Sequence, residues 1–255
     1  MTLIPRILRF DAVDSTNSQA ERLALEGAEE GLCIVADEQT AGRGRLRREW
    51  SSPKGAGLYF TMLLRPRIPQ ASWPLITLLA SIAVTDVLRE QCRLESDIKW
   101  PNDVLVAGRK ICGILAETSD TPTGRAIALG IGINLTAEAF PPTLLKTAIS
   151  LEEATGQPVK RETILSPLVP ALIRYYQLLN DGQEGQIIAE WCKRSSYAND
   201  KFVQIVTGDK TIRGVTHGLE TNGALRLRTA DGKIKIVYAG DVTILRENSR
   251  TPSNS

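Results

Sequence analysis

The sequence predicts an α+β fold, in which helices flank a mixed central β-sheet and a small β-barrel follows at the C-terminus. Three observations lead to this prediction. Apolar runs with the length of strands occur at 31–36, 58–65 and 125–135, and a hairpin pattern occupies 97–117. Longer segments with helical periodicity occur near 18–26, 73–91 and 183–194. From 201 onward, short alternating runs are separated by two strong hairpin signals, Asn222-Gly223 and Asp231-Gly232.

The first predicted elements are an edge strand in 3–12 and a helix. Ser18 and Glu21 fit a capping box for this helix, and Gly27 is a plausible stop. After the strand at 58–65, Pro74 opens the most apolar segment of the chain. We expect a buried helix there and no membrane partner, because the segment carries several polar residues: Thr77, Ser81, Thr85 and Asp86.

In the middle of the chain, the pattern of residues 97–117 is typical of a hairpin that turns at Ala107-Gly108. The next strand, 125–135, carries Gly130 and Gly132. Glycine weakens a strand unless a ligand or another backbone must approach closely. These two glycines therefore indicate such an approach.

The remaining elements are helices and the small barrel. Ser150 and Glu153 form a second capping box, Ser166-Pro167 predicts the start of another helix, and Gln183–Arg194 is amphipathic. We therefore divide the chain into a large domain at 1–198, a barrel of about five strands at 199–248 and a disordered polar tail at 249–255.

The composition is that of a globular protein, with 255 residues of which 42% are hydrophobic and 24% are charged. The formal net charge of +2 is too balanced for non-specific nucleic-acid binding over the whole surface, so any basic patch must be local. With His217 as the single histidine, neither a His-based triad nor a protein metal site is expected. Four scattered cysteines without a CxxC pair indicate reduced thiols and a cytoplasmic protein: Cys33, Cys92, Cys112 and Cys192.

The segment that says most about function is the basic loop, residues 39–50, with the sequence Gln-Thr-Ala-Gly-Arg-Gly-Arg-Leu-Arg-Arg-Glu-Trp. Arginine stays charged and offers forked donors that suit phosphate and carboxylate, and glycine lets the backbone approach a ligand. The loop therefore predicts an anion-binding segment, mobile when empty because its like charges repel. A P-loop is a poor alternative because no Gly-Lys-Ser/Thr is present. The remaining alternative is a solvated surface loop.

Four segments share their order and spacing with one family. Ser15-Thr16-Asn17 precedes the first helix, and the basic loop resembles the pattern Gly-Arg-Gly-Arg-x-Gly-Arg-x-Trp. Lys99-Trp100-Pro101-Asn102-Asp103 is followed by Arg109–Leu115, and Gly130-Ile131-Gly132-Ile133-Asn134 completes the set. Over roughly residues 10–247, the chain resembles the biotin protein ligases, which join biotin to a lysine of biotin-dependent carboxylases.

The resemblance implies a biotin/lipoyl ligase-like catalytic domain, an SH3-like C-terminal barrel and a reaction in two steps. The carboxylate of biotin attacks the α-phosphate of ATP, supplied with Mg²⁺, to give biotinyl-5′-AMP and pyrophosphate. A lysine of a biotin carboxyl carrier protein then attacks the mixed anhydride. The chain begins almost directly at this domain, so we expect no helix-turn-helix and no DNA partner. Side-by-side dimers occur among related ligases, which leaves a homodimer open.

By resemblance, the catalytic residues are Lys110, Arg45 and Asp103. The residues expected to bind biotin are Ser15, Thr16, Asn17, Gln39, Gly42, Arg43, Gly44, Arg45, Lys110 and Gly113. The residues expected to bind the nucleotide are Arg43, Arg45, Arg48, Trp50, Lys110, Gly132 and Asn134.

Several of these residues have a second interpretation. Lys110 could be an exposed strand lysine, and Ser15 to Asn17 could serve only to cap the helix. Trp50 could cover the adenine or anchor the loop, and Asp103 could assist the acceptor lysine or merely belong to a turn. Arg47 stands where the family pattern has a glycine, which leaves the geometry of that turn open.

Two other functions remain to be tested. A lipoate or octanoate ligase or transferase has the same fold, and some of these enzymes use a cysteine nucleophile. Cys112 is close to the predicted site, but no histidine or second cysteine accompanies it. A non-enzymatic RNA-binding module would use a basic face of the barrel, for which base-stacking aromatics are scarce. That face would consist of Lys210, Arg213, Arg226, Arg228, Lys233 and Lys235.

Overall fold

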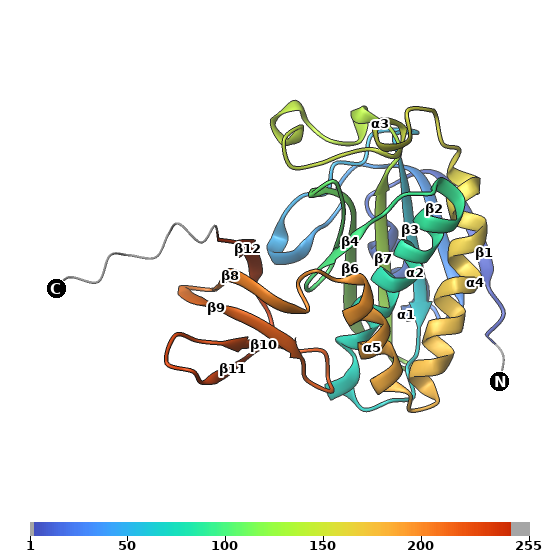
Figure 1. Cartoon of the computed structure of the whole chain (residues 1–255). Coiled ribbons are helices and arrows are strands. Elements are labelled where there is room, and N and C mark those ends of the chain that lie inside the picture. Colours follow the sequence, from blue (N-terminus) through green and yellow to red (C-terminus); the bar gives the residue numbers. More distant parts are fainter. Residues whose placement is uncertain (1–2, 246–255) are drawn as a thin grey trace.

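Two β-sheets organise the chain in the computed structural model, which describes residues 3–245 (Figure 1). The larger sheet has the strand order β1-β2-β3-β7-β6-β5-β4. Its strands are β1 Arg6–Val13, β2 Leu32–Gln39, β3 Gly57–Leu64, β4 Asp97–Lys99, β5 Asp103–Val106, β6 Arg109–Thr121 and β7 Gly124–Asn134. β1 and β2 are parallel and the other pairs are antiparallel, so the sheet is mixed, as predicted.

The smaller sheet is antiparallel, with the order β11-β10-β9-β8-β12, and occupies the position predicted for the barrel. Its strands are β8 Asn199–Thr207, β9 Lys210–Leu219, β10 Leu225–Arg228, β11 Ile234–Val237 and β12 Asp241–Ile244. It docks beside the β4–β5 turn, where Trp100 Nε1 donates to Gly223 O at 3.0 Å, and the segment that leads into it is held by Ser195 Oγ, which donates to Ile98 O at 2.6 Å. The predicted tail at 249–255 lies outside the described residues.

The helices cover opposite faces of the large sheet. They are α1 Thr16–Leu25, α2 Leu75–Cys92, α3 Leu151–Thr155, α4 Arg161–Asn180 and α5 Glu184–Arg194. Successive side chains of β2 point to opposite faces: Leu32 and Ile34 pack in the apolar cluster of α1, whereas Cys33 and Val35 pack with α2. Figure 1 shows α2, α4 and α5 together on one face.

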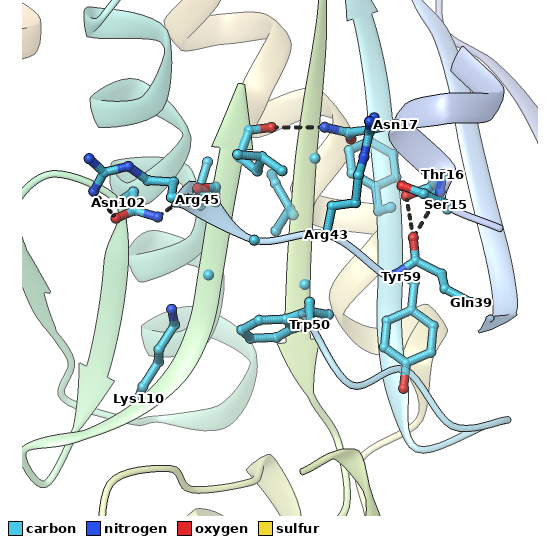
Figure 2. Close-up of a pocket in the computed structure, with 18 residues that line it drawn as sticks. Ser15, Thr16, Asn17, Gln39, Arg43, Arg45, Trp50, Tyr59, Asn102 and Lys110 are labelled. Carbon is cyan, nitrogen blue, oxygen red and sulfur yellow. Dashed lines mark hydrogen bonds between the residues drawn. The ribbon is translucent and has the colours of Figure 1, made fainter. Parts of the chain in front are cut away.

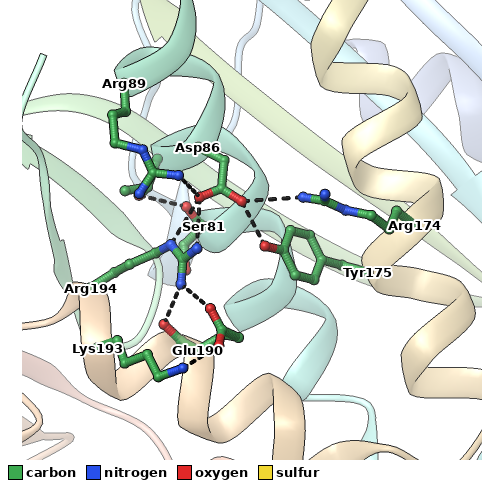
Figure 3. Close-up of polar contacts among 9 residues, drawn as sticks. Ser81, Asp86, Arg89, Arg174, Tyr175, Glu190, Lys193 and Arg194 are labelled. Atoms are coloured by element: carbon green, nitrogen blue, oxygen red, sulfur yellow. Dashed lines mark hydrogen bonds and ion pairs between the residues drawn. The ribbon is translucent and has the colours of Figure 1, made fainter. Parts of the chain in front are cut away.

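Helix α2 is apolar enough to pass a length and composition test for a membrane span, but 72% of the tested window is buried inside the protein. Its one buried acid, Asp86, joins three helices (Figure 3). Arg194 of α5 and Tyr175 of α4 contact its carboxylate, the tyrosine hydroxyl donating at 2.6 Å. The predicted buried helix is therefore confirmed, and the carboxylate of Asp86 has partners inside the protein.

Two predicted helix starts are wrong. Helix α1 begins at Thr16 with Ser15 at the N-cap, so Ser18 lies inside the helix and forms no capping box. Helix α4 begins at Arg161 and runs through Pro167, because burial of residues such as Ile164 on its first turns outweighs the unfavourable proline. The capping box at Ser150 is confirmed, since its hydroxyl accepts from Glu153 N at 3.2 Å.

The segment predicted as one hairpin over 97–117 is a three-stranded meander, β4-β5-β6. Its predicted turn at Ala107-Gly108 is confirmed, with both residues at positive φ of 50° and 74°. β6 continues to Thr121, well past its last pairing with β5 at Gly113. Beyond Gly113, β6 therefore has a strand partner only on its β7 side, and this part of the strand borders the candidate site.

Candidate active site

The floor of the site is a patch of small residues on the face of the sheet that α1 covers only in part. Along β7, residues 126, 128, 130 and 132 are Ala, Ala, Gly and Gly, and they alternate with large apolar residues that face α2. Helix α1 packs on the two alanines but does not extend beyond Gly130. At Gly130 itself, a Cβ would lie 2.3 Å from Asn17 Oδ1. Gly132 and its cross-strand partner Gly113 continue the floor.

Trp50 lies on this floor at the end of the basic loop (Figure 2). A Cβ at Gly132 would lie 2.6 Å from the indole, and one at Gly113 would lie 2.9 Å from it. Both glycines are therefore needed for the close approach of the indole, and the approach of a ligand to the strand glycines stays a prediction. Trp50 anchors the loop and forms a wall of the pocket, and the predicted stacking on adenine stays a prediction.

Neutral hydrogen-bonding groups gather at one end of the pocket, around the N-terminus of α1. Gln39 Oε1 accepts from Thr16 N at 2.8 Å and from Thr16 Oγ1 at 3.1 Å. Gln39 Nε2 donates to Ser52 Oγ at 2.7 Å. Ser15 is 3% exposed, and its hydroxyl makes no capping hydrogen bond to the helix. Capping therefore does not account for the buried Ser15 hydroxyl.

Positive charge gathers at the other end of the pocket. Arg45 donates to Asn102 Oδ1 at 3.1 Å and to Gly240 O at 3.4 Å, both neutral oxygens. Burial lowers the pKa of Arg45 below its ordinary value, although Asp241 and Asp103 oppose this effect. Among residues 3–245, Arg45 forms no ion pair with a carboxylate. A half-buried arginine with neutral partners is well suited to receive an anion.

Lys110 projects from β6 beside this arginine. Its Nζ lies 2.6 Å from Asp103 Oδ1 and 5.2 Å from the centre of the Trp50 ring. The backbone around it is fixed, because Lys110 N donates to Thr147 O at 2.8 Å and Lys110 O accepts from Asn134 Nδ2 at 3.3 Å. The sheet therefore aims the lysine at the pocket, and Asp103 is its direct partner.

The basic loop is held by carboxylates from two other elements. Arg43 lies 2.9 Å from Glu117 Oε2 on β6, and Arg48 pairs with Asp241 on β12. Leu46 and Arg47 lie between them with φ of 56° and 59°, a conformation that glycine adopts at little cost. The predicted mobility of the empty loop stays a prediction.

Most of the predicted site residues meet in one cavity. Those lining it are Ser15, Thr16, Asn17, Gln39, Arg43, Gly44, Arg45, Trp50, Lys110, Gly113 and Gly132. The cavity volume is about 60 Å³, whereas small-molecule sites have roughly 300–1,000 Å³. The cavity in this structure is therefore smaller than a typical small-molecule site.

Three predicted binding residues lie outside this cavity. Gly42 packs behind the loop, where a Cβ would lie 2.2 Å from Trp50 O. Arg48 is directed to Asp241. The Asn134 amide donates to Lys110 O and Ile149 O, so it holds the strand that carries the lysine. In this structure all three shape the site without lining it.

Sequence reasoning missed several residues of the site. Asn102 belongs to a quoted motif but was given no role, and it holds Arg45. Thr61 and Tyr59 come from β3, which carries no motif, and Glu117 lies on β6 two residues beyond the quoted Arg109–Leu115 segment. Thr61 is a fully buried polar residue within an apolar strand, which is the one local signal that could have indicated it.

Comparison with known proteins places these features in a family. Residues 10–134 match the biotin/lipoate A/B protein ligase family, and 200–245 match the biotin protein ligase C-terminal domain. A Paracoccus denitrificans protein named biotin--[acetyl-CoA-carboxylase] ligase is 35% identical over 238 residues, which are 90% of this chain and 96% of that protein. This chain belongs to the biotin protein ligase family.

Two further relatives agree with this assignment. The bifunctional ligase/repressor BirA of Bacillus subtilis is 35% identical over 243 residues, which are 93% of this chain and 74% of that protein. The biotin protein ligase of Aquifex aeolicus, solved in complex with biotin and ATP, is 30% identical with a TM-score of 0.79. That match covers 95% of this chain and 100% of the Aquifex chain. The predicted fold class and family are confirmed.

Proposed function

We propose that this protein activates biotin with ATP to form biotinyl-5′-AMP and then transfers biotin to a lysine of a biotin carboxyl carrier protein or domain. The observation that carries the proposal is Arg45, which is half-buried among neutral partners beside Lys110. The opposite end of the same pocket holds neutral donors and acceptors, which suit the uncharged ureido head of biotin.

In the first step, the biotin carboxylate attacks the α-phosphorus of ATP and pyrophosphate leaves. Both reactants are anionic, so cations fixed at the meeting point lower the barrier. Lys110 and Arg45 take this role, and Arg43 covers the pocket from the loop. Among residues 3–245 no cluster of three metal-binding side chains occurs, so Mg²⁺ is expected to enter with the phosphates of ATP.

In the second step, the amine of the acceptor lysine attacks the anhydride carbonyl and AMP leaves. This amine has an ordinary pKa near 10.4 and needs a partner that takes its proton. Asp103 is the carboxylate nearest to Lys110, at 2.6 Å, and we assign it to orient or deprotonate the incoming amine. Closure of the loop keeps water from the anhydride.

The alternative of a thiol-dependent acyl transferase is weaker. Cys112 is fully buried on the α2 face of β6, and burial raises the pKa of its thiol far above the ordinary value. An RNA-binding role for the barrel is also weak. Several cations of the proposed basic face already have local partners, such as Arg226 with Glu220 and Lys233 with Asp231.

We further propose a cytoplasmic location, in line with the four free cysteines. The absence of operator-type DNA binding stays a prediction, to be checked by a binding assay at about 200 mM salt, where non-specific phosphate contacts are weak. For the homodimer, the unpaired side of β6 beyond Gly113 is an edge to which a second chain could add a strand.

The decisive experiment is ATP–pyrophosphate exchange without acceptor protein, with biotin, lipoate or octanoate as the acid and Cys112→Ala as a control variant. We expect exchange with biotin alone, and no loss in the Cys112 variant. Exchange with lipoate or octanoate but not biotin would contradict the proposal.

A further inference from the structure

Glu117 is a carboxylate at the rim of the pocket that belongs to none of the four family motifs. It comes from the part of β6 that has β7 on one side and no β5 partner on the other. A single oxygen, Oε2, lies 2.9 Å from Arg43 and accepts from Asn17 Nδ2 at 2.8 Å. One end of the basic loop is thereby joined to the end of helix α1 that borders the pocket.

The contacts behind Asn17 continue into the head-group end of the pocket. Asn17 is 3% exposed, and its Oδ1 accepts from Thr61 Oγ1 at 2.6 Å. Thr61 Oγ1 lies 2.8 Å from Thr16 Oγ1, which in turn donates to Gln39 Oε1 at 3.1 Å. A series of polar contacts therefore runs from the groups assigned to biotin to the carboxylate that holds Arg43, with the two threonine hydroxyls in contact at its centre.

Arg43 and Glu117 are both accessible enough to part. Their side chains are 39% and 36% exposed, whereas Asn17 and Thr61 behind them are buried. The fixed part of the chain can therefore orient Glu117 while its contact to Arg43 opens and closes with the loop. A contact of this kind controls how long the loop stays closed without touching the reacting atoms.

We infer that Glu117 is a positioning residue that holds Arg43 and the basic loop closed over the pocket. This inference rests on the proposed function, because the intermediate that the loop retains is the biotinyl adenylate. Its role is retention and not chemistry: Glu117 touches neither the Lys110–Asp103 pair nor Arg45 in this structure. Losing its charge should increase escape of the adenylate and leave the adenylation step itself unaffected.

The first test measures how readily trypsin cleaves the basic loop when no ligand is bound. Limited trypsin digestion of the Glu117→Gln protein is followed by mass spectrometry for cleavage after Arg43 to Arg48. The matched control is Asp120→Asn, which removes a carboxylate on the same strand that pairs with Arg125 at 2.7 Å outside the pocket. We expect faster cleavage than in wild type for Glu117→Gln only. Equal cleavage in both variants would overturn the inference, even if the protein were not a biotin ligase.

The second test measures the dissociation rate of biotinyl-AMP and the single-turnover rate of adenylation at saturating biotin and ATP. We expect dissociation about three- to tenfold faster in Glu117→Gln, as for loss of a partly exposed charged contact, with adenylation changed less than about twofold. Arg43→Gln and Glu117→Gln together should have less than the sum of their separate effects on dissociation, because both substitutions break the same contact. An unchanged dissociation rate, or additive effects of the two substitutions, would overturn the inference.

Discussion

Two groups of arginines in this protein differ in the partners that surround them. Arg89, Arg174 and Arg194 converge on one buried carboxylate, Asp86, between α2, α4 and α5 (Figure 3). The arginines of the basic loop diverge instead: Arg43 and Arg45 project to different sides of the pocket (Figure 2), and Arg48 reaches the small sheet. The arginines of the first group share the buried carboxylate of Asp86, whereas those of the basic loop lie around the pocket.

The pKa values show the same difference. Burial disfavours the charge of Arg194, but hydrogen bonds to Glu190 and Asp86 outweigh burial, and its pKa is raised. For Arg45, burial is the dominant effect and its pKa is lowered, because its hydrogen-bond partners are neutral oxygens. A cluster of arginines in space therefore does not by itself indicate an anion site, and the partners of each arginine distinguish the two groups. The following substitutions test this distinction.

The largest effect on stability is expected from Asp86→Asn. Three cations would lose their shared carboxylate, one of them, Arg194, only 14% exposed. Removing one member of a buried ion pair costs about 3–5 kcal/mol of unfolding free energy. Urea unfolding measures this loss. Exchange activity per folded molecule should stay within about twofold of wild type, and its loss would show that the helix cluster supports the site directly.

The largest effect on activity is expected from Lys110→Ala. Loss of a cation that acts in the transition state should lower the exchange rate about 100-fold or more. The unfolding free energy should change by no more than about 1 kcal/mol, because the lysine is a partly exposed strand residue. Exchange kinetics and urea unfolding of one preparation separate the two effects. Normal exchange would mean that Lys110 is only a surface lysine.

Arg45→Gln should allow the intermediate to escape. A hydrogen bond to a charged group contributes about 1.5–3 kcal/mol, so the dissociation of biotinyl-AMP should be at least about tenfold faster. The released adenylate would then label nearby amines indiscriminately. Arg125→Gln, at an arginine paired with Asp120 outside the pocket, is the control. If both variants retained the adenylate equally, Arg45 would be no more than a structural contact.

Glu190 gives the arginine cluster a pH dependence. Hydrogen bonds from Lys193 and Arg194 lower its pKa from 4.5 to about 2. Its ionised form therefore stabilises the fold above the unfolded-state pKa, and this contribution is lost as the pH falls toward 2. Glu190→Gln should lower the unfolding free energy by up to about 1 kcal/mol at pH 7, with the difference from wild type shrinking below pH 4.5. A constant difference down to pH 2 would contradict this.

The smallest effect is expected from Arg47→Gly, which restores the residue of the family pattern. Arg47 has a φ of 59°, which costs a non-glycine residue about 1–2 kcal/mol, while glycine loses about 0.5–1 kcal/mol in chain entropy. The net gain in unfolding free energy should be about 0.5–1 kcal/mol, with retention of the adenylate equal or better. Faster escape would mean that the charge of Arg47 itself binds the ligand.

Residues whose roles depend on local pattern could be predicted. The alternation along β7 and the glycines of the loop are visible in sequence, because strand periodicity and glycine conformation are short-range effects. The start of α4 could not be predicted in the same way. Ser166-Pro167 is a good local start signal, but tertiary burial of Ile164 and Leu165 extends the helix in the N-terminal direction.

The sequence by itself determined the family, the mixed sheet with a small C-terminal β-domain, and the lysine and arginines that make the pocket cationic. Only the tertiary structure decided which side chains these cations contact. Glu117 lies 74 positions from Arg43 in the sequence, and Asp241 lies 193 from Arg48. Such pairs depend on strand register and domain docking. No local rule of charge or periodicity specifies them, because the partner that comes within reach depends on contacts between residues far apart in the sequence.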